Sequence, residues 1–334
     1  MTTRPLRVGV AGAGHFGRYH ALKLAASPRA ELAGVHDHDP EHAARVSGET
    51  GARIFDLPGL LAACDALIVA VPAAAHHTIA AAALRANRHV LVEKPIAATL
   101  AEADVLAALA AERDLVLQVG HLERFSGGHG AIRERAGAPL YIEAGRMGPF
   151  KSRGTDVSVV LDLMIHDLDL VLELVGSPIA AVEAVGAPVA SPLCDIVNAR
   201  LRFASGAVAT ITASRVAPRV ERRMRIFGVQ GCVSVDFVAR TLSATTLGRG
   251  SPVAGLPGFG VETASWVEHD ALEAEQAAFI AAVLDGAPVA VDAAAGRRAL
   301  AAALLVEAAV KQTEERMRAS GLLHDLDHRL GGGL

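Results

Sequence analysis

Short apolar runs alternate with longer segments of helical periodicity along the first 120 residues of the chain. Uninterrupted apolar runs of this kind are typical of strands that are covered on both faces, as in a parallel sheet. They read LRVGVAG, AELAGVHD, CDALIVAVP, HVLVEKPIA and LVLQVGH, and helical segments such as TIAAAALRAN and TLAEADVLAALAAERD lie between them. The alternation predicts an α/β domain over residues 1–120, built on a doubly wound parallel sheet.

From residue 121 onward the pattern changes to strands in which apolar and polar residues alternate. Such alternation is typical of antiparallel sheets that bury one face. The helices predicted at 159–176, 271–285 and 293–318 are expected to lie near this sheet. We therefore predict a second, α+β domain over residues 121–334, with a predominantly antiparallel open sheet. Its other face is expected to be exposed, and the alternation in VATITASRV leaves apolar surface there.

The segment VVLDLMIHDLDLVLELVG, residues 159–176, is apolar but carries charged residues along one side of its predicted helix. At about 100° per residue, the polar side chains fall within an arc of roughly 60° while apolar side chains cover the other faces. The members of this stripe are Asp162, His166, Asp169 and Glu173. A stripe of this kind is either a solvated helix face, which is the commoner arrangement, or the lining of an active site.

Composition limits the class of protein and its partners. The chain has 334 residues, of which 51% are hydrophobic and 20% charged, as expected for a soluble globular protein of two domains. Its formal charge of −4 gives no global electrostatic reason to bind nucleic acid or anionic lipid. Cys64, Cys194 and Cys232 are far apart and show no CxxC pairing, which favours free thiols over disulfides or a zinc site.

The chain shows no export or membrane signal. Its start, MTTRPLRVGVAG, lacks the apolar stretch and the cleavage site of a signal peptide. The longest uncharged apolar stretch, at 66–84, is interrupted by Pro72, His76 and His77, which argues against a membrane span. We therefore expect a cytoplasmic protein that binds neither membrane nor nucleic acid.

Three glycines in GAGHFG mark a dinucleotide site, because they follow a predicted strand and precede a predicted helix. Gly12 permits the tight turn, Gly14 lets the backbone approach a pyrophosphate, and Gly17 allows the helix to pack closely on the strand. The next strand ends at Asp37, 20 residues after Gly17, where a carboxylate can bind the ribose hydroxyls. The first domain is therefore predicted to be a Rossmann domain.

Asp37 favours NAD over NADP, because its carboxylate would repel a 2′-phosphate. His38 and Arg45 keep NADP possible, since they could offset that charge. The cluster HDHDPEH at 36–42 is dense enough in imidazole and carboxylate to suggest a metal site. We disfavour this alternative, because Pro40 marks a turn and Asp37 already has a role, and we expect no metal.

Several motifs in order along the chain resemble the Gfo/Idh/MocA family of nicotinamide-dependent sugar and polyol dehydrogenases. The likeness covers nearly the whole chain and rests on AGAGHFGRYHA, PAAAH, EKP, GHLERF, DLMIHDLD, RLRFASGAVATITASR and IFGVQGCVSVDF. It implies an enzyme that oxidises a secondary hydroxyl group with NAD as acceptor, and a homodimer or homotetramer. The polar stripe of the 159–176 helix would then face an active site.

The resemblance also implies roles for individual residues. Lys94, Asp162 and His166 would form the catalytic group: histidine can accept the hydroxyl proton, the aspartate can orient it, and the lysine can bind the substrate oxygen. For His76 we favour structural support over contact with the substrate. Contacts to the cofactor are expected from Gly12, Gly14, His15, Phe16, Gly17, Asp37, Val71, Pro72, His76, Glu93 and Lys94.

Two basic stretches, PFKSRGTD and SRVAPRVERRMR, suit a phosphorylated or nucleotide-linked substrate, since guanidinium binds phosphate in a bidentate manner. For any one of the arginines Arg215, Arg219, Arg222, Arg223 and Arg225, a solvated surface role is the commoner one, and phosphate binding is expected of them as a set. GHLERF and RMGPFKSRGTDV resemble the branch of the family that contains UDP-N-acetylglucosamine 3-dehydrogenases. We therefore expect oxidation of a UDP-N-acetylhexosamine at ring position 3, with substrate contacts from Lys94, Arg124, Lys151, Arg153, Asp162 and His166.

Two alternative functions stay open. The first is an inositol or free-sugar dehydrogenase, which would use the same catalytic group on a substrate without a nucleotide. The second is a nicotinamide-binding regulator that has lost the chemistry, which the joint presence of Lys94, Asp162 and His166 disfavours.

Overall fold

The structure is a computed structural model that describes residues 4–151, 157–267 and 270–321. Within these ranges the chain packs into two compact units. The first unit holds the chain up to Ser126 and, from the C-terminal part, the segment that ends at Leu300. The remaining residues form the second unit.

From the sequence we predicted one domain boundary, at residue 120. The structure differs in that the chain comes back to the first unit after the second sheet, with the segment that ends at Leu300. Helix α8 (Ala271–Asp285) follows the second sheet in sequence, and we expected it to lie near that sheet. It packs instead against α1 (His15–Ala26) and η1 (Leu122–Phe125) of the first unit. Leu272, Phe279 and Ile280 are the buried apolar residues of this helix that make such packing favourable.

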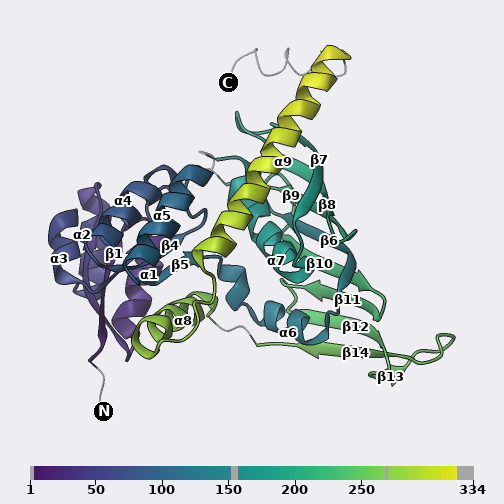
Figure 1. Cartoon of the computed structure of the whole chain (residues 1–334), viewed down its shortest axis with the longest axis horizontal. Helices are drawn as coiled ribbons and strands as arrows, with labels where there is room; N and C mark the ends of the chain where they lie inside the picture. The colour runs from purple at the N-terminus through teal and green to yellow at the C-terminus, as the bar shows by residue number, and fades with distance from the viewer. Residues whose placement is uncertain (1–3, 152–156, 268–269, 322–334) are drawn as a thin grey trace. The chain divides into compact units, whose positions relative to one another are not determined.

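The first unit is built on a five-stranded parallel sheet in the order β2-β1-β3-β4-β5 (Figure 1). The chain leaves β1 to form β2 on one side and then crosses to β3 on the other, so the strand order reverses beside β1. Ligands of such sheets bind at the carboxyl ends of the strands at this reversal. The predicted doubly wound sheet is confirmed, with strands Leu6–Ala11, Ala30–His36, Ala66–Val69, His89–Glu93 and Leu117–Gly120.

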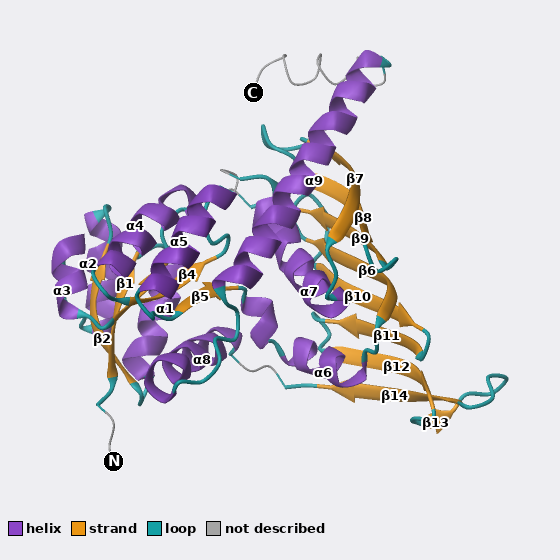
Figure 2. Cartoon of the chain, viewed as in Figure 1, coloured by secondary structure: helices purple, strands orange, loops and turns teal. Residues whose placement is uncertain are grey.

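Helices connect these strands (Figure 2). Capping residues define where several of these helices begin. Asp39 accepts a hydrogen bond from the Glu41 N–H at the start of α2, and Thr99 with Glu102 forms a capping box at the start of α5. We had not predicted α2 and α3. Besides α1 and α8, the helices are α2 (Pro40–Thr50), α3 (Leu57–Ala63), α4 (Ala73–Arg85) and α5 (Leu100–Glu112).

The second unit is built on a nine-stranded sheet in the order β13-β14-β12-β11-β10-β6-β9-β8-β7 (Figure 2). Neighbouring strands are antiparallel except β6 and β9, which are parallel. This confirms the predicted, mostly antiparallel sheet. The strands are Pro139–Met147, Ile179–Ala187, Ile196–Phe203, Val208–Ser214, Glu221–Gly228, Gly231–Asp236, Thr241–Leu247, Ser251–Pro252 and Phe259–Ser265.

The face of β9 that points away from the core is more polar than we expected from VATITASRV. In β9 the buried apolar residues are Ala209, Ile211 and Ala213, so the alternation turns Thr210 and Thr212 to the other face. Thr212 accepts a hydrogen bond of 2.8 Å from the Asn198 amide on β8. The apolar half of the strand pattern is used in the core, and β9 offers little apolar surface for association.

The helices of the second unit are α6 (Gly127–Arg135), α7 (Ile165–Val175) and the part of α9 (Ala293–Ala319) that follows Leu300. The predicted helix at 159–176 is therefore shorter, and its first turn is a π-helical turn, η2 (Val160–Met164). The Ile165 N–H bonds to the carbonyl of Val160, five residues earlier. Across the described ranges, no helix is both long and apolar enough to cross a membrane.

Polar contacts fix α7 to its neighbours on two sides. Asp167 is buried and forms a bidentate ion pair with Arg146 on β6, with N–O distances of 2.9 and 3.1 Å. Glu173 accepts a hydrogen bond of 2.7 Å from His129 on α6. Because a buried charge is costly unless it is paired, these contacts define the position of α7 on the sheet.

A second buried ion pair lies at the start of η2. Arg215, at the end of β9, binds Asp195 at 2.7 Å and donates to the carbonyl of Val157 at 2.9 Å. Burial alone would raise the pKa of Asp195, but backbone N–H donors and Arg215 outweigh it and hold this pKa well below its usual range. The N–H donors are those of Val189, Ala190 and Ser191. Arg215 is thus part of the interior of this unit.

We expect Arg215→Ala to lower the free energy of unfolding of the protein by about 3–5 kcal/mol, because it leaves Asp195 buried without its cation. Arg225→Ala is the matched control, since the Arg225 side chain is 56% exposed and lies 3.6 Å from Glu143. We expect this control to cost less than about 1 kcal/mol. Urea denaturation followed by circular dichroism measures both, and equal effects would contradict the structural role of Arg215.

Candidate active site

The glycine-rich turn between β1 and α1 has the geometry of a phosphate-binding loop. Gly12 has a φ of +94°, and a Cβ there would lie 2.5 Å from the carbonyl oxygen of Ala70. A Cβ on Gly17 would lie 1.7 Å from the oxygen of Gly12, so this glycine is required for close packing of the helix. At Gly14 no heavy atom of a described residue lies within 4 Å of an added Cβ. The open side of the turn is therefore at Gly14, as a bound pyrophosphate requires.

The amino end of α1 follows this turn and can hold an anion. Gly14 is the N-cap residue, and no described side chain caps the helix. The N–H groups of the first turn, which begins with His15 and the 40% exposed Phe16, can therefore donate to phosphate oxygens. These observations fit a dinucleotide, which NAD and NADP share.

Asp37 lies directly after β2, at the position predicted for a ribose-binding carboxylate. One oxygen accepts a hydrogen bond of 2.5 Å from the Ala13 N–H and the other accepts one of 2.9 Å from the Asp39 N–H. His38 Nδ1 lies 3.1 Å from the carboxylate, and Arg45 donates to the carbonyl of Ala13 at 3.2 Å. The carboxylate is thus held beside the glycine turn, with basic groups next to it.

The EKP motif forms the carboxyl end of β4. Glu93 is the last residue of the strand, and the half-buried Lys94 follows it directly. His76 on α4 is buried, and its two ring nitrogens bond to the carbonyls of Pro95, at 2.7 Å, and Val71, at 2.8 Å. Burial lowers the pKa of His76, and the carbonyls of Pro95 and Val71 act in the opposite direction. These contacts give His76 a structural role, and Pro72 lies beside it at the start of α4.

Sequence analysis missed a buried polar cluster behind Glu93. His20 Nε2 lies 2.9 Å from Glu93, and the opposite ring nitrogen lies 2.9 Å from the amide nitrogen of Gln276. Glu275 completes the cluster from α8. A signal for it is visible in ALEAEQAAFIAAVLD, because Glu275 and Gln276 occupy the helical register of the apolar residues Leu272 and Phe279.

Asp162 and His166 lie four residues apart on η2 and α7, and both are half-buried. The neighbouring members of the predicted stripe differ: Asp169 is buried and Glu173 binds His129. Asp162 and His166 are therefore the members of the stripe that combine partial exposure with titratable side chains suited to proton transfer.

Backbone hydrogen bonds join the two segments of chain that carry the basic stretches. The Gly148 N–H donates to Ser214 at 2.9 Å, and the Ala217 N–H donates to Gly148 at 3.0 Å. Lys151 and Arg219, which follow these residues along the chain, are both exposed. Arg153 lies outside the described residues, and the half-buried Arg124 lies on η1 in the first unit.

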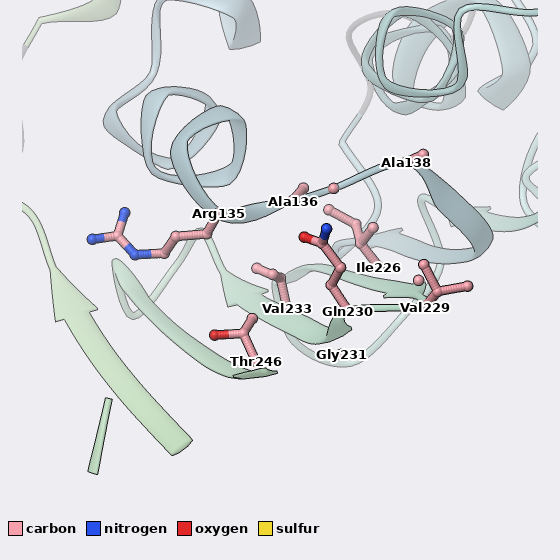
Figure 3. A pocket seen from close by; sticks show the side chains of 11 residues that line it. Arg135, Ala136, Ala138, Ile226, Val229, Gln230, Gly231, Val233 and Thr246 are labelled. Carbon is pink, nitrogen blue, oxygen red and sulfur yellow. The ribbon is translucent and has the colours of Figure 1, made fainter. Parts of the chain in front are cut away.

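A small cavity of about 100 Å³ lies in the second unit beside the turn between β10 and β11. Figure 3 shows the Gln230 side chain directed toward the segment that carries Ala136 and Ala138. Arg135 and Thr246 line another part of its wall. Its lining includes none of the predicted site residues that the structure describes.

Both units match models of one protein family. Residues 6–121 match the oxidoreductase family with an NAD-binding Rossmann fold, GFO/IDH/MocA. Residues 131–234 match the GFO/IDH/MocA C-terminal domain.

Similar proteins cover nearly the full chain. The chain is 43% identical over 93% of its length to a UDP-N-acetylglucosamine 3-dehydrogenase of Acidithiobacillus ferrooxidans and covers 99% of that protein. A solved structure of that enzyme matches with a TM-score of 0.87, again over 93% of this chain and 99% of the other. The chain is also 25% identical to the scyllo-inositol 2-dehydrogenase (NAD(+)) of Bacillus subtilis, over 76% of this chain and 80% of that protein.

A structure of GenD2 from gentamicin A biosynthesis in complex with NAD matches at 26% identity and a TM-score of 0.78. The match covers 93% of this chain and 95% of GenD2. Together with the two matching domain models, these similarities show that the chain belongs to the Gfo/Idh/MocA family of NAD-binding oxidoreductases.

Proposed function

We propose that this protein is an NAD-dependent dehydrogenase that oxidises the 3-hydroxyl of a UDP-linked N-acetylhexosamine to a ketone. The observation that carries the proposal is the 43% identity to a UDP-N-acetylglucosamine 3-dehydrogenase over 99% of that enzyme. The inositol dehydrogenases among the relatives are more distant, with 25% identity for the enzyme of Bacillus subtilis. Lys94, Asp162 and His166 supply side chains suited to this chemistry.

In the proposed reaction, His166 accepts the proton of the sugar hydroxyl as general base. Asp162 lies one turn earlier and stabilises the protonated imidazole through its negative charge. Lys94 donates a hydrogen bond to the substrate oxygen, which stabilises the negative charge that develops on it. Bound NAD would accept the hydride from the sugar carbon that carries this hydroxyl.

The cofactor would be held by the first unit. The open side of Gly14 and the first N–H groups of α1 would bind the pyrophosphate, and Asp37 would accept hydrogen bonds from the ribose hydroxyls.

For the substrate, Lys151 and Arg219 are the exposed cations whose segments share a backbone contact at Gly148. They would meet the diphosphate, together with Arg153 and Arg124. Assembly as a homodimer or homotetramer and a cytoplasmic location also stay predictions.

We expect NAD to bind at least about tenfold more tightly than NADP, because Asp37 would repel a 2′-phosphate. Asp37→Asn is the companion variant, since it removes the charge and keeps an oxygen for the Ala13 N–H, while its amide nitrogen replaces the oxygen that accepts from the Asp39 N–H. The variant should narrow the difference between the two affinities. Fluorescence titration of NADH and NADPH measures both, and equal affinities in the wild type would contradict this role.

We expect His166→Ala to reduce kcat by about a hundredfold or more while the affinity for NAD stays nearly unchanged, as for the loss of a general base. Asp162→Asn should reduce kcat less, because it removes the partner of the base and leaves the base itself. Steady-state formation of NADH measures kcat, and wild-type turnover in His166→Ala would exclude the role.

The substrate itself is the main test of the proposal. We expect a UDP-linked N-acetylhexosamine to show a far higher kcat/KM than free N-acetylglucosamine or myo-inositol. Contacts with the remote diphosphate and uridine can position the sugar hydroxyl for reaction, and a free sugar lacks them. Formation of NADH with UDP-N-acetylglucosamine, the free sugar and myo-inositol decides the question. A better rate with inositol would support the alternative of an inositol dehydrogenase.

A further inference from the structure

Glu275 on α8 is a buried acid that the proposed chemistry does not use. Its exposed fraction is 0%, and neither carboxylate oxygen receives a hydrogen bond from a described residue. Ligand atoms of Glu275, Glu93 and His20 all lie within 4.8 Å of one another. Two adjacent carboxylates cannot both stay ionised in such surroundings without a compensating proton or cation.

The hydrogen bonds of His20 indicate whether a proton or a metal cation compensates the charge of the two carboxylates. The Gln276 amide nitrogen donates to His20 Nδ1 at 2.9 Å and to the His20 carbonyl at 3.1 Å. Nδ1 therefore accepts, and the ring proton resides on Nε2, which faces Glu93. A metal ion would need the lone pair of Nε2. His20 therefore donates a hydrogen bond to Glu93. Since this arrangement leaves no lone pair on Nε2 for a metal ion, we infer that a proton on Glu275 compensates the second carboxylate.

The surroundings of Glu93 and Glu275 indicate which of the two carboxyl groups carries the proton. Burial raises the pKa of Glu275 well above its usual range, and the negative charge of Glu93 raises it further. Burial also acts to raise the pKa of Glu93, but the hydrogen bond from His20 and the positive charge of Lys94 outweigh it and lower this pKa. Glu93 is thus the ionised acid and Glu275 the neutral one.

The cluster joins four elements at the strand end that precedes Lys94. His20 comes from α1, Glu93 from β4, and Glu275 from α8. Gln118 on β5 donates to the Glu275 carbonyl at 3.0 Å, and the backbone of Glu93 pairs with Gly120 on the same strand. A change in the charge of this cluster would therefore act on the backbone that carries Lys94.

We propose that Glu275 is a positioning residue that stays protonated in the folded protein, donates a hydrogen bond to the Glu93 carboxylate, and thereby fixes the strand end that holds Lys94. The link to Lys94 rests on the proposed function, whereas the protonation of Glu275 does not. The proposal therefore has two tests, of which the first needs no substrate.

The first test compares thermal unfolding of the wild type, Glu275→Gln and Glu273→Gln from pH 5 to pH 9. The unfolded chain releases the Glu275 proton near pH 4.5, but the folded protein keeps it, so wild-type stability should fall as the pH rises above that value. Glu275→Gln offers Glu93 a permanent N–H donor. Its melting temperature should match the wild type at pH 5 and exceed it by at least about 3 °C at pH 9.

Glu273→Gln is the matched control, because Glu273 is exposed on the same helix and its variant should follow the wild-type curve. Parallel curves for Glu275→Gln and the wild type would overturn the proposal. So would one equivalent of metal in purified wild-type protein, measured by mass spectrometry and lost in Glu275→Gln. That result would make the cluster a cation site.

The second test compares Glu275→Gln with Glu275→Ala in steady-state kinetics. We expect Glu275→Gln to keep wild-type kcat, because it keeps a donor to Glu93. Glu275→Ala should lose about tenfold or more in kcat with less change in the KM for NAD, because Lys94 is displaced while the glycine turn is intact. Equal kcat values for the two variants would refute the positioning role. An inactive wild type would instead count against the proposed substrate and leave the melting curves as the test of protonation.

Discussion

The requirement that every buried charge has a partner governs both units of this protein. An unpaired charge in the interior costs several kcal/mol, so each buried ionisable group here defines the position of another element. In the first unit, Glu93 is bonded to His20 on α1. In the second, Arg146 fixes Asp167 on α7, and Arg215 joins Asp195 to the backbone before η2. Within each unit, apolar packing brings the sheet and its helices together, and these pairs fix elements that carry or adjoin the residues proposed for catalysis.

The same requirement limits which cations can serve a substrate. Of the basic residues near β9 and β10, Arg215 is buried in its ion pair, whereas Arg223, which binds Asp236 at 3.1 Å, keeps a side chain that is 56% exposed. A guanidinium that stabilises an internal carboxylate cannot also bind a diphosphate. We therefore assign any role in phosphate binding to exposed residues such as Lys151 and Arg219. The set of candidate phosphate-binding residues is therefore smaller than the two basic stretches of the sequence suggest.

Features that depend on local backbone geometry were predictable from the sequence, and those that depend on distant partners were not. The roles of Gly12 and Gly17 could be predicted from the sequence, because one turn imposes their conformation and packing. The π-helical turn that contains Asp162 depends on how η2 meets the sheet, and no periodicity encodes it. Glu275 pairs with Glu93 across 182 residues of sequence, from 275 − 93, so its role appears only in the folded chain.

The polar positions within apolar helices carry more functional information here than the exposed charges. A surface lysine can be replaced at little cost in stability, whereas a buried glutamate such as Glu275 persists only where its proton or charge has a use. Glu275 and Gln276 occupy core positions of α8 that leucine could fill. Glu275 lies next to Glu93, at the strand end before Lys94, and Gln276 bonds to His20. An apolar replacement would leave His20 and Glu93 to pair alone, and the ionised carboxylate would lose the donor that we assign to it. The family's EKP motif is thus one part of a larger cluster, whose remaining members lie far away in the sequence.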